Sequence, residues 1–315
     1  MAAYSRTMRI SLLFLASLSL AAKDTPVLVW MKDGTLKEIA ATASSIKMGT
    51  RAIPIGSILS VHSGEAATEA ESARIKAGIG AIQGTDRKAS DAAVEDLTTL
   101  GVPVITPLLT AYKDTDQHEP RPLYRLFERI MPVNADGLDR GLSMVRLAGG
   151  EIVRGKIESF SLNGQVKFSD VRGFAVRRKE VARRVNVHSI QHSTQIEFFD
   201  TAVVPSPLSK ASSSASGFTR LSWAEDGWAT DPDGLKVPGP RYKTNLVDGH
   251  PFGALVGRGG AKGAVYLVGM KWNGAGLPLA RLQLAINDNR HWQNNLGSYR
   301  VTLRVSDAYD VGEAQ

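Results

Sequence analysis

The sequence contains no cysteine among its 315 residues. Disulfide bonds, lipid attachment to a cysteine side chain and cysteine-based catalysis are therefore excluded. The chain must be held together by the burial of apolar side chains or by bound ions. Hydrophobic residues make up 43% of the chain and charged residues 22%, which is typical of an ordinary globular protein rather than a disordered one.

Long apolar runs are also absent, and the most apolar stretch is a short run near the start of the chain. This run extends from Ile10 to Leu20, follows Arg6 and Arg9, and has small residues at its end. Such an arrangement indicates a cleaved signal peptide over residues 1–22, and the run is too short to span a bilayer. An uncleaved anchor is the alternative. We therefore expect a secreted or periplasmic protein with no transmembrane span in the mature chain.

Acidic residues are fewer than basic ones, 31 against 38, and the formal net charge is +7. Arg6 and Arg9 contribute two of these charges, which leaves about +5 (7 − 2) for the mature chain. This excess permits weak attraction to acidic surfaces. The densest basic run, Arg177 to Arg184, is expected to be a solvated strand edge or linker, with an anionic-surface patch as the alternative. We expect no nucleic-acid partner, because the protein is expected to be exported.

Two segments of the N-terminal half look like copies of one another at an offset of 116 residues (145 − 29). Each begins with alternating apolar residues, from Val29 in the first and Val145 in the second, and alternates again after a glycine-containing turn. The pattern predicts two small, bent, SH3-like β units over residues 23–65 and 141–190. Chance similarity of two generic hairpins is the alternative.

The segment between these units, residues 66–133, has a different pattern. Its first part is rich in alanine, and the residues from Ala92 to Leu100 have helical spacing before a glycine at position 101. These features predict a short helical insert, similar to a HEAT-type hairpin, that packs on the flanking β units. Such a short insert does not make a repeat array.

Residues 191–306 have the pattern of an antiparallel β-sandwich. Short apolar runs are separated by turn residues, and the residues from Tyr299 to Val305 alternate between apolar and polar. The serine-rich stretch from Lys210 to Gly217 has low complexity, and we expect a long, mobile loop there. Residues 307–315 are expected to form a tail. The predicted fold is mainly β, with the sandwich preceded by two small β units and a helical insert.

Sequence motifs for catalysis are scarce. There is no His-Glu-x-x-His and no Gly-x-Ser-x-Gly. The glycine-rich stretch from Gly257 to Gly263 lacks the Lys-Ser or Lys-Thr ending of a phosphate-binding loop, and a turn between strands explains it better. We therefore expect no enzymatic activity. An enzyme whose chemistry lies in the N-terminal half is a less favoured alternative.

The segment from Asn287 to Ser298 joins the last two expected strands and is long and polar. A hairpin connection needs only about two to five residues. Asp288 lies where this loop begins, and Asn294 and Asn295 lie where it ends. Calcium takes about six to eight oxygen ligands, so a loop folded back on itself could bring these side chains to one ion. Asn and Asp are also ordinary turn residues, which is the alternative.

Four short motifs carry a resemblance to a known family. They are Phe199 to Thr201, Gly227 to Thr230, Pro251 to Gly257, and Asn287-Asp288 followed by Asn294 to Tyr299. On these motifs the C-terminal third resembles the PA-I galactophilic lectin family of calcium-dependent, sugar-binding bacterial β-sandwiches.

The resemblance implies a lectin-like sandwich of jelly-roll type. It implies that Asp288, Asn294 and Asn295 ligate calcium, and that vicinal hydroxyls of a sugar complete the coordination. It also implies that a backbone carbonyl near Asp231 reaches the same ion.

Residues beside this loop are candidates for sugar contacts. His291 and Trp292 lie within the loop, and His250 lies near another of the motifs. A tryptophan face could stack on a pyranose ring, so we expect contacts from these residues together with Asp288 and Asn294. Burial of Trp292 beneath the loop, and surface positions for the two histidines, are the alternatives.

Two hypotheses of different classes follow. The favoured one is an exported, calcium-assisted carbohydrate-binding protein with an N-terminal adaptor region, whose partner is a glycan or exopolysaccharide of unknown specificity. The other is an envelope scaffold whose sandwich has lost sugar binding and contacts protein partners.

Overall fold

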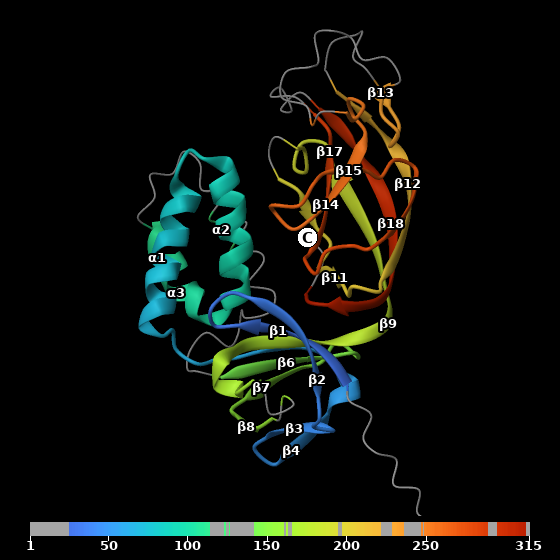
Figure 1. Cartoon of the computed structure of the whole chain (residues 1–315). Coiled ribbons are helices and arrows are strands. Elements are labelled where there is room, and N and C mark those ends of the chain that lie inside the picture. Colours follow the sequence, from blue (N-terminus) through green and yellow to red (C-terminus); the bar gives the residue numbers. More distant parts are fainter. Residues whose placement is uncertain are drawn as a thin grey trace, which may run out of the picture.

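The computed structural model describes residues 25–113, 123, 126, 142–160, 162, 166–194, 197–221, 229–235, 247, 249–288 and 295–312. The expected signal peptide lies outside these residues, as does most of the helical insert beyond residue 113. No helix in the described part of the chain is long and apolar enough to cross a membrane. The chain forms a bent β body, a group of helices and a C-terminal sandwich (Figure 1).

Both of the similar segments contribute to a single N-terminal β body. Its strands are β1 (Thr25–Met31), β2 (Leu36–Ala41), β3 (Ser45–Met48), β4 (Arg51–Pro54), β5 (Ile58–His62), β6 (Ser143–Leu147), β7 (Ile152–Gly155), β8 (Ile157–Ser159) and the first part of β9 (Val171–His188). β5 pairs with β6, β3 pairs with β8, and β1 pairs with β9. The two units expected at 23–65 and 141–190 are therefore not separate bodies, because strands of each complete sheets begun by the other.

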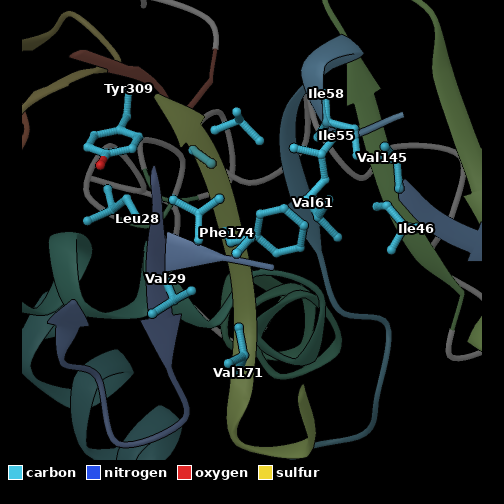
Figure 2. Packing of buried hydrophobic residues seen from close by; sticks show 14 of the residues in the cluster. Leu28, Val29, Ile46, Ile55, Ile58, Val61, Val145, Val171, Phe174 and Tyr309 are labelled. Carbon is cyan, nitrogen blue, oxygen red and sulfur yellow. The ribbon is translucent and has the colours of Figure 1, made fainter. Parts of the chain in front are cut away.

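One hydrophobic core holds the β body together (Figure 2). Val29, Val61 and Phe174, from three different strands, are each 0% exposed. Phe160 stacks on Phe174 with ring centroids 4.6 Å apart. Tyr309 lies in the same cluster but comes from β18 (Leu296–Asp310), the last strand of the sandwich. The core of the β body thus continues into the sandwich.

The helices are α1 (Glu69–Gln83), α2 (Arg87–Leu100) and α3 (Val102–Lys113). Thr68 and Glu71 form a capping box at the start of α1, and Asp86 caps α2. Gly101 follows α2 with a φ of 63°, a conformation that favours glycine. The predicted helical insert is confirmed for the described residues.

A buried ion pair attaches α1 to the β body. Arg172 on β9 and Glu71 are 1% and 2% exposed, and the guanidinium donates hydrogen bonds to both carboxylate oxygens. Arg172 also donates to the backbone carbonyls of Glu65 and Ala66, at 2.9 and 3.0 Å. Burial opposes ionisation of Glu71, but the hydrogen bonds from Arg172 and Thr68 outweigh it and hold the pKa of this carboxyl below its usual value.

His62, at the end of β5, is a second buried polar group. It is 7% exposed, its ring centroid lies 5.4 Å from that of Trp30, and its Nε2 has no hydrogen-bond partner among the described residues. Burial, with smaller contributions from Arg146 and Arg281, lowers the pKa of His62 to about 3. The ring is therefore neutral at physiological pH.

We expect the protein to lose stability as the pH falls below about 6.5, the usual pKa of histidine. The unfolded chain takes up a proton there that folded His62 does not, so the contribution of this residue is present at pH 7 and lost towards its folded pKa of about 3. Between pH 7 and pH 5 the loss amounts to about 2 kcal/mol. Urea unfolding at both pH values, compared between the wild type and His62→Phe, measures it. An equal pH dependence in both proteins would contradict the assignment.

The C-terminal sandwich consists of two antiparallel sheets. The larger sheet contains β13 (Ala229–Thr230), β12 (Lys210–Arg220), β18 and β9 in that order, with β16 (Lys271–Ala275) paired to β12 and β11 (Val203–Pro205) paired to β18. The other sheet has the order β10 (Phe199–Asp200), β17 (Leu282–Ile286), β14 (Leu255–Gly259) and β15 (Tyr266–Leu267). Side chains such as Val185, Ile286 and Val301 fill the space between the sheets. The predicted antiparallel sandwich is confirmed.

The serine-rich stretch is a strand, and the prediction of a mobile loop from Lys210 to Gly217 is wrong. These residues belong to β12, which pairs with β18 on one side and β16 on the other. Ser213 is buried on the inner face, whereas Ser214 and Ser216 are exposed on the outer face. The alternation of a strand is present, but small polar side chains conceal it, and the two neighbouring strands determine the conformation.

The basic run from Arg177 to Arg184 lies within β9, a strand that belongs to both bodies. Residues 171–176 pair with β1 and β5 of the β body, and residues 177–188 pair with β18 of the sandwich. The run is therefore part of a strand and not a linker. Residues 307–315 were expected to form a tail, but residues 308–310 belong to the end of β18 and pair with β11.

Candidate functional site

The candidate site lies at the end of the sandwich that is remote from the β body. There β17 ends at Ile286, and β18 begins at Leu296 (Figure 1). In the larger sheet, Leu296 lies opposite Arg220 at the end of β12, and nearby Ser298 lies opposite His188 at the end of β9. The segment from residue 287 to residue 295 therefore connects the two sheets at this end.

Asp288 and Asn295, from the two ends of the polar loop, are in direct contact. Nδ2 of Asn295 donates hydrogen bonds to Oδ2 of Asp288 and, at 3.2 Å, to the carbonyl oxygen of Ser189. Asp288 is 1% exposed and Asn295 is 0% exposed. Oδ1 of Asn295 is buried and has no hydrogen-bond partner among the described residues. The site thus combines a buried carboxylate with a buried amide oxygen to which no described residue donates.

Neighbouring residues fix the backbone on both sides of this pair. Oγ1 of Thr194 accepts a hydrogen bond from the backbone N–H of Asp288 and donates one to its carbonyl, both at 3.2 Å. The backbone N–H and hydroxyl of Ser189 both donate to the carbonyl of Gly297, at 3.1 and 3.0 Å. Gly297 has a φ of 93°, and a Cβ there would lie 2.4 Å from the carbonyl oxygen of Phe218. The motif therefore requires glycine at this position.

Asn287 organises the adjacent loop. Its Oδ1 accepts a hydrogen bond from the N–H of Val247 at 3.0 Å, and its Nδ2 donates to the carbonyls of His250 and Pro251 at 3.0 and 3.1 Å. Its own carbonyl accepts from the N–H of Gly253 at 2.7 Å. The resemblance includes Asn287 in a motif, but sequence reasoning gave it no role. Only its structural partners identify it as a positioning residue.

The hydroxyl of Tyr299 joins three further segments at this end. This residue is 0% exposed, and its oxygen lies 2.7 Å from the carbonyl oxygens of both Asp231 and Gly253 and 3.0 Å from Oγ1 of Thr219. Burial raises the pKa of Tyr299 far above its usual value, so the hydroxyl keeps its proton. The aromatic residue at the end of the motif thus holds the loops beside the site against β12.

The structure brings together two of the predicted calcium ligands. Asp288 and Asn295 are in contact, whereas Asn294 lies outside the described residues. The carbonyl of Asp231 accepts the hydrogen bond from Tyr299, and its exposed carboxylate accepts one from the N–H of Asp233 at 2.9 Å. Within the described part of the chain, no three His, Cys, Asp or Glu side chains gather into a metal cluster. A metal here would therefore need amide or carbonyl oxygens beside the carboxylate of Asp288.

Of the three ring-bearing residues predicted to contact a sugar, the structure describes His250 alone. His291 and Trp292 lie outside the described residues. Nε2 of His250 lies 3.2 Å from the carbonyl oxygen of Val265, so this partly buried ring already has a partner within the fold. His250 is connected to the site through the hydrogen bond from Asn287 to its carbonyl.

Comparison with known proteins gives few matches. No family model matches the chain, and no curated protein matches it. Among solved structures, the N-terminal domain of EclA, described as a PllA-like lectin, is 20% identical, with a TM-score of 0.29. The match covers 40% of this chain and 96% of that chain. This likeness is weak and concerns the fold alone.

Proposed function

We propose that this protein is an exported carbohydrate-binding protein in which calcium, held by Asp288 and Asn295, takes part in sugar binding. The observation that carries the proposal is the contact between these two buried side chains, one a carboxylate and the other with an amide oxygen that has no donor among the described residues. Export rests on the pattern of residues 1–22.

Calcium fits the chemistry of these groups. A buried amide oxygen without a donor costs about 1–3 kcal/mol. Calcium prefers carboxylate, amide and carbonyl oxygens, so it would give the amide oxygen of Asn295 a partner and accept the carboxylate of Asp288 as a second ligand. Bound calcium would supply a positive centre for the hydroxyls of a sugar. The chain would hold the two ligands in place through the hydrogen bonds of Ser189 and Thr194.

We expect calcium to stabilise the folded protein. Sites with few carboxylates in extracellular proteins bind calcium with dissociation constants of about 0.1–1 mM. At about 10 mM calcium, binding to the folded state alone would add roughly 1.4–2.7 kcal/mol to the free energy of unfolding. Thermal unfolding of the protein in calcium, in magnesium and in EDTA measures the effect.

Calcium should raise the Tm more than magnesium does, and the Asp288→Asn variant should show no calcium-dependent shift. A wild-type Tm that is the same in calcium and in EDTA would contradict the metal site. It would favour the alternative function, a scaffold whose sandwich meets protein partners.

A further inference from the structure

The outer face of the larger sandwich sheet carries many basic side chains. On β18, Val301, Leu303 and Val305 are buried. Arg300, which precedes Val301, and Arg304, which lies between Leu303 and Val305, are exposed. The same alternation on the neighbouring strands identifies the outward basic residues as Arg184 on β9, Lys210 and Arg220 on β12, Lys271 on β16, and Arg300 and Arg304 on β18. This outer face takes in the described outward positions of residues 180–188 of β9, of β12, of β16 and of residues 296–306 of β18. Among them, Glu180 is the only acidic residue.

A groove follows β12 between rows of longer side chains. The strand register places Ser212 between Arg304 of β18 and Asn273 of β16, and Ser214 beside Lys271. Because strands lie about 4.8 Å apart, the flanking rows are roughly 10 Å from one another. A hollow of about 400 Å³ occupies one end of this groove, with Ser212, Arg304 and Glu180 in its lining, and Glu180 lies 2.9 Å from Arg304. Serine hydroxyls therefore form a polar floor between two ridges, which carry Arg300 and Arg304 on β18 and Lys271 on β16.

An exposed aromatic ring lies further along β12, away from the hollow. Phe218, at an outward position of β12 opposite Ser298, is 63% exposed. An exposed ring of this kind offers a flat face for the C–H bonds of a pyranose. The face lies on the side of the sandwich away from the helices (Figure 1). The helices lie beside the opposite sheet, where Asp91 lies 3.8 Å from Arg258.

We propose that this groove binds an extended acidic polysaccharide along β12. Basic ridges would pair with its carboxylate or sulfate groups, the serine hydroxyls would hydrogen-bond its hydroxyls, and Phe218 would stack on one ring. The spacing of the ridges suits a single chain and is far narrower than a nucleic-acid duplex. A flat membrane would meet the ridges and leave the serine floor unused. This exposed face is separate from the Asp288–Asn295 pair, which is buried.

The test uses the full chain in EDTA, so that calcium-dependent binding does not contribute. Binding of polygalacturonate oligosaccharides and of neutral dextran oligosaccharides is measured by calorimetry at low and high salt. We expect the acidic chain alone to bind, and salt to weaken it. Lys271→Glu combined with Arg300→Glu should weaken binding by about tenfold, since two attractive pairs become repulsive. Lys76→Glu combined with Lys88→Glu, exposed positions on the helices with the same change in net charge, should change it less than about twofold.

A second variant tests the groove and not the charge. Ser214→Trp fills the floor without altering any charge, and an exposed strand position accepts tryptophan. It should weaken polygalacturonate binding severalfold. Equal losses in the two charge-reversal proteins, or undiminished binding by Ser214→Trp, would overturn the proposal. Equal binding of polyaspartate or of anionic phospholipid vesicles would overturn it in favour of a general anionic surface. Asp288→Asn should leave this binding unchanged, which separates it from the proposed calcium-dependent function.

Discussion

Replacing Asp288 by asparagine is expected to abolish calcium-dependent glycan binding. The substitution keeps the size of the side chain and its contact with Asn295, but removes the carboxylate charge that a divalent ion requires. A glycan array probed with the full chain in calcium and in EDTA measures the effect, and retention by the variant should fall to the level seen in EDTA. Asp231→Asn is the matched control, because the predicted role of Asp231 uses its backbone carbonyl and its side chain is exposed.

The converse change, Asn295→Asp, separates a metal site from a hydrogen-bonded pair. Two buried carboxylates in contact repel one another, so this variant should be less stable than the wild type in EDTA. Calcium should restore its stability, because a second carboxylate strengthens a calcium site. If Asp288→Asn retains glycans as the wild type does, and calcium does not rescue Asn295→Asp, the metal-assisted mechanism is wrong.

Removing the charge of Glu71 is expected to have the largest effect on stability. Glu71→Gln leaves the guanidinium of Arg172, which is 1% exposed, without its counter-charge. Breaking one side of a buried ion pair costs about 3–5 kcal/mol. Urea unfolding at pH 7 should show this loss, followed by tryptophan fluorescence and circular dichroism.

A double variant tests whether the loss comes from the unpaired charge. Glu71→Leu with Arg172→Met removes both charges from the interior, and such replacements are often close to neutral. This protein should therefore be more stable than Glu71→Gln. Glu180→Gln, which breaks an exposed pair with Arg304, should leave stability almost unchanged. A double variant as unstable as Glu71→Gln would show that packing, and not charge, dominates at this contact.

The sandwich and the helices could be predicted because their signals are local. Alternating residues such as those from Tyr299 to Val305 indicate a strand by themselves, and Gly101 marks the end of α2. The joining of the two N-terminal segments could not be predicted, because it depends on pairs such as Val29 with Phe174 that are far apart in sequence. The strand β12 could not be predicted, because its two neighbouring strands, and not its serines, determine its conformation.

The candidate site was predictable in part for the same reason. Asp288 and Asn295 carry oxygen atoms at the two ends of one long loop, so they could be expected to meet if the loop folded back on itself, although the strands that it joins, β17 and β18, belong to different sheets. The position of Asn287 could not be expected, because its partners belong to a separate loop around residue 250. The hydroxyl of Tyr299 likewise reaches Asp231 and Gly253 through the fold and not through sequence spacing.

The continuity of β9 determines how the sandwich can be separated from the rest of the molecule. A fragment that begins at residue 190 would lack the strand to which β18 is hydrogen-bonded between His188 and Arg177, and would expose a long unpaired edge. A pull applied between the tip of the sandwich and the β body would run lengthwise along this ladder and load many hydrogen bonds at once. The tip of the sandwich is therefore connected to the N-terminal part through one continuous strand, and a load at the tip would pass along this strand.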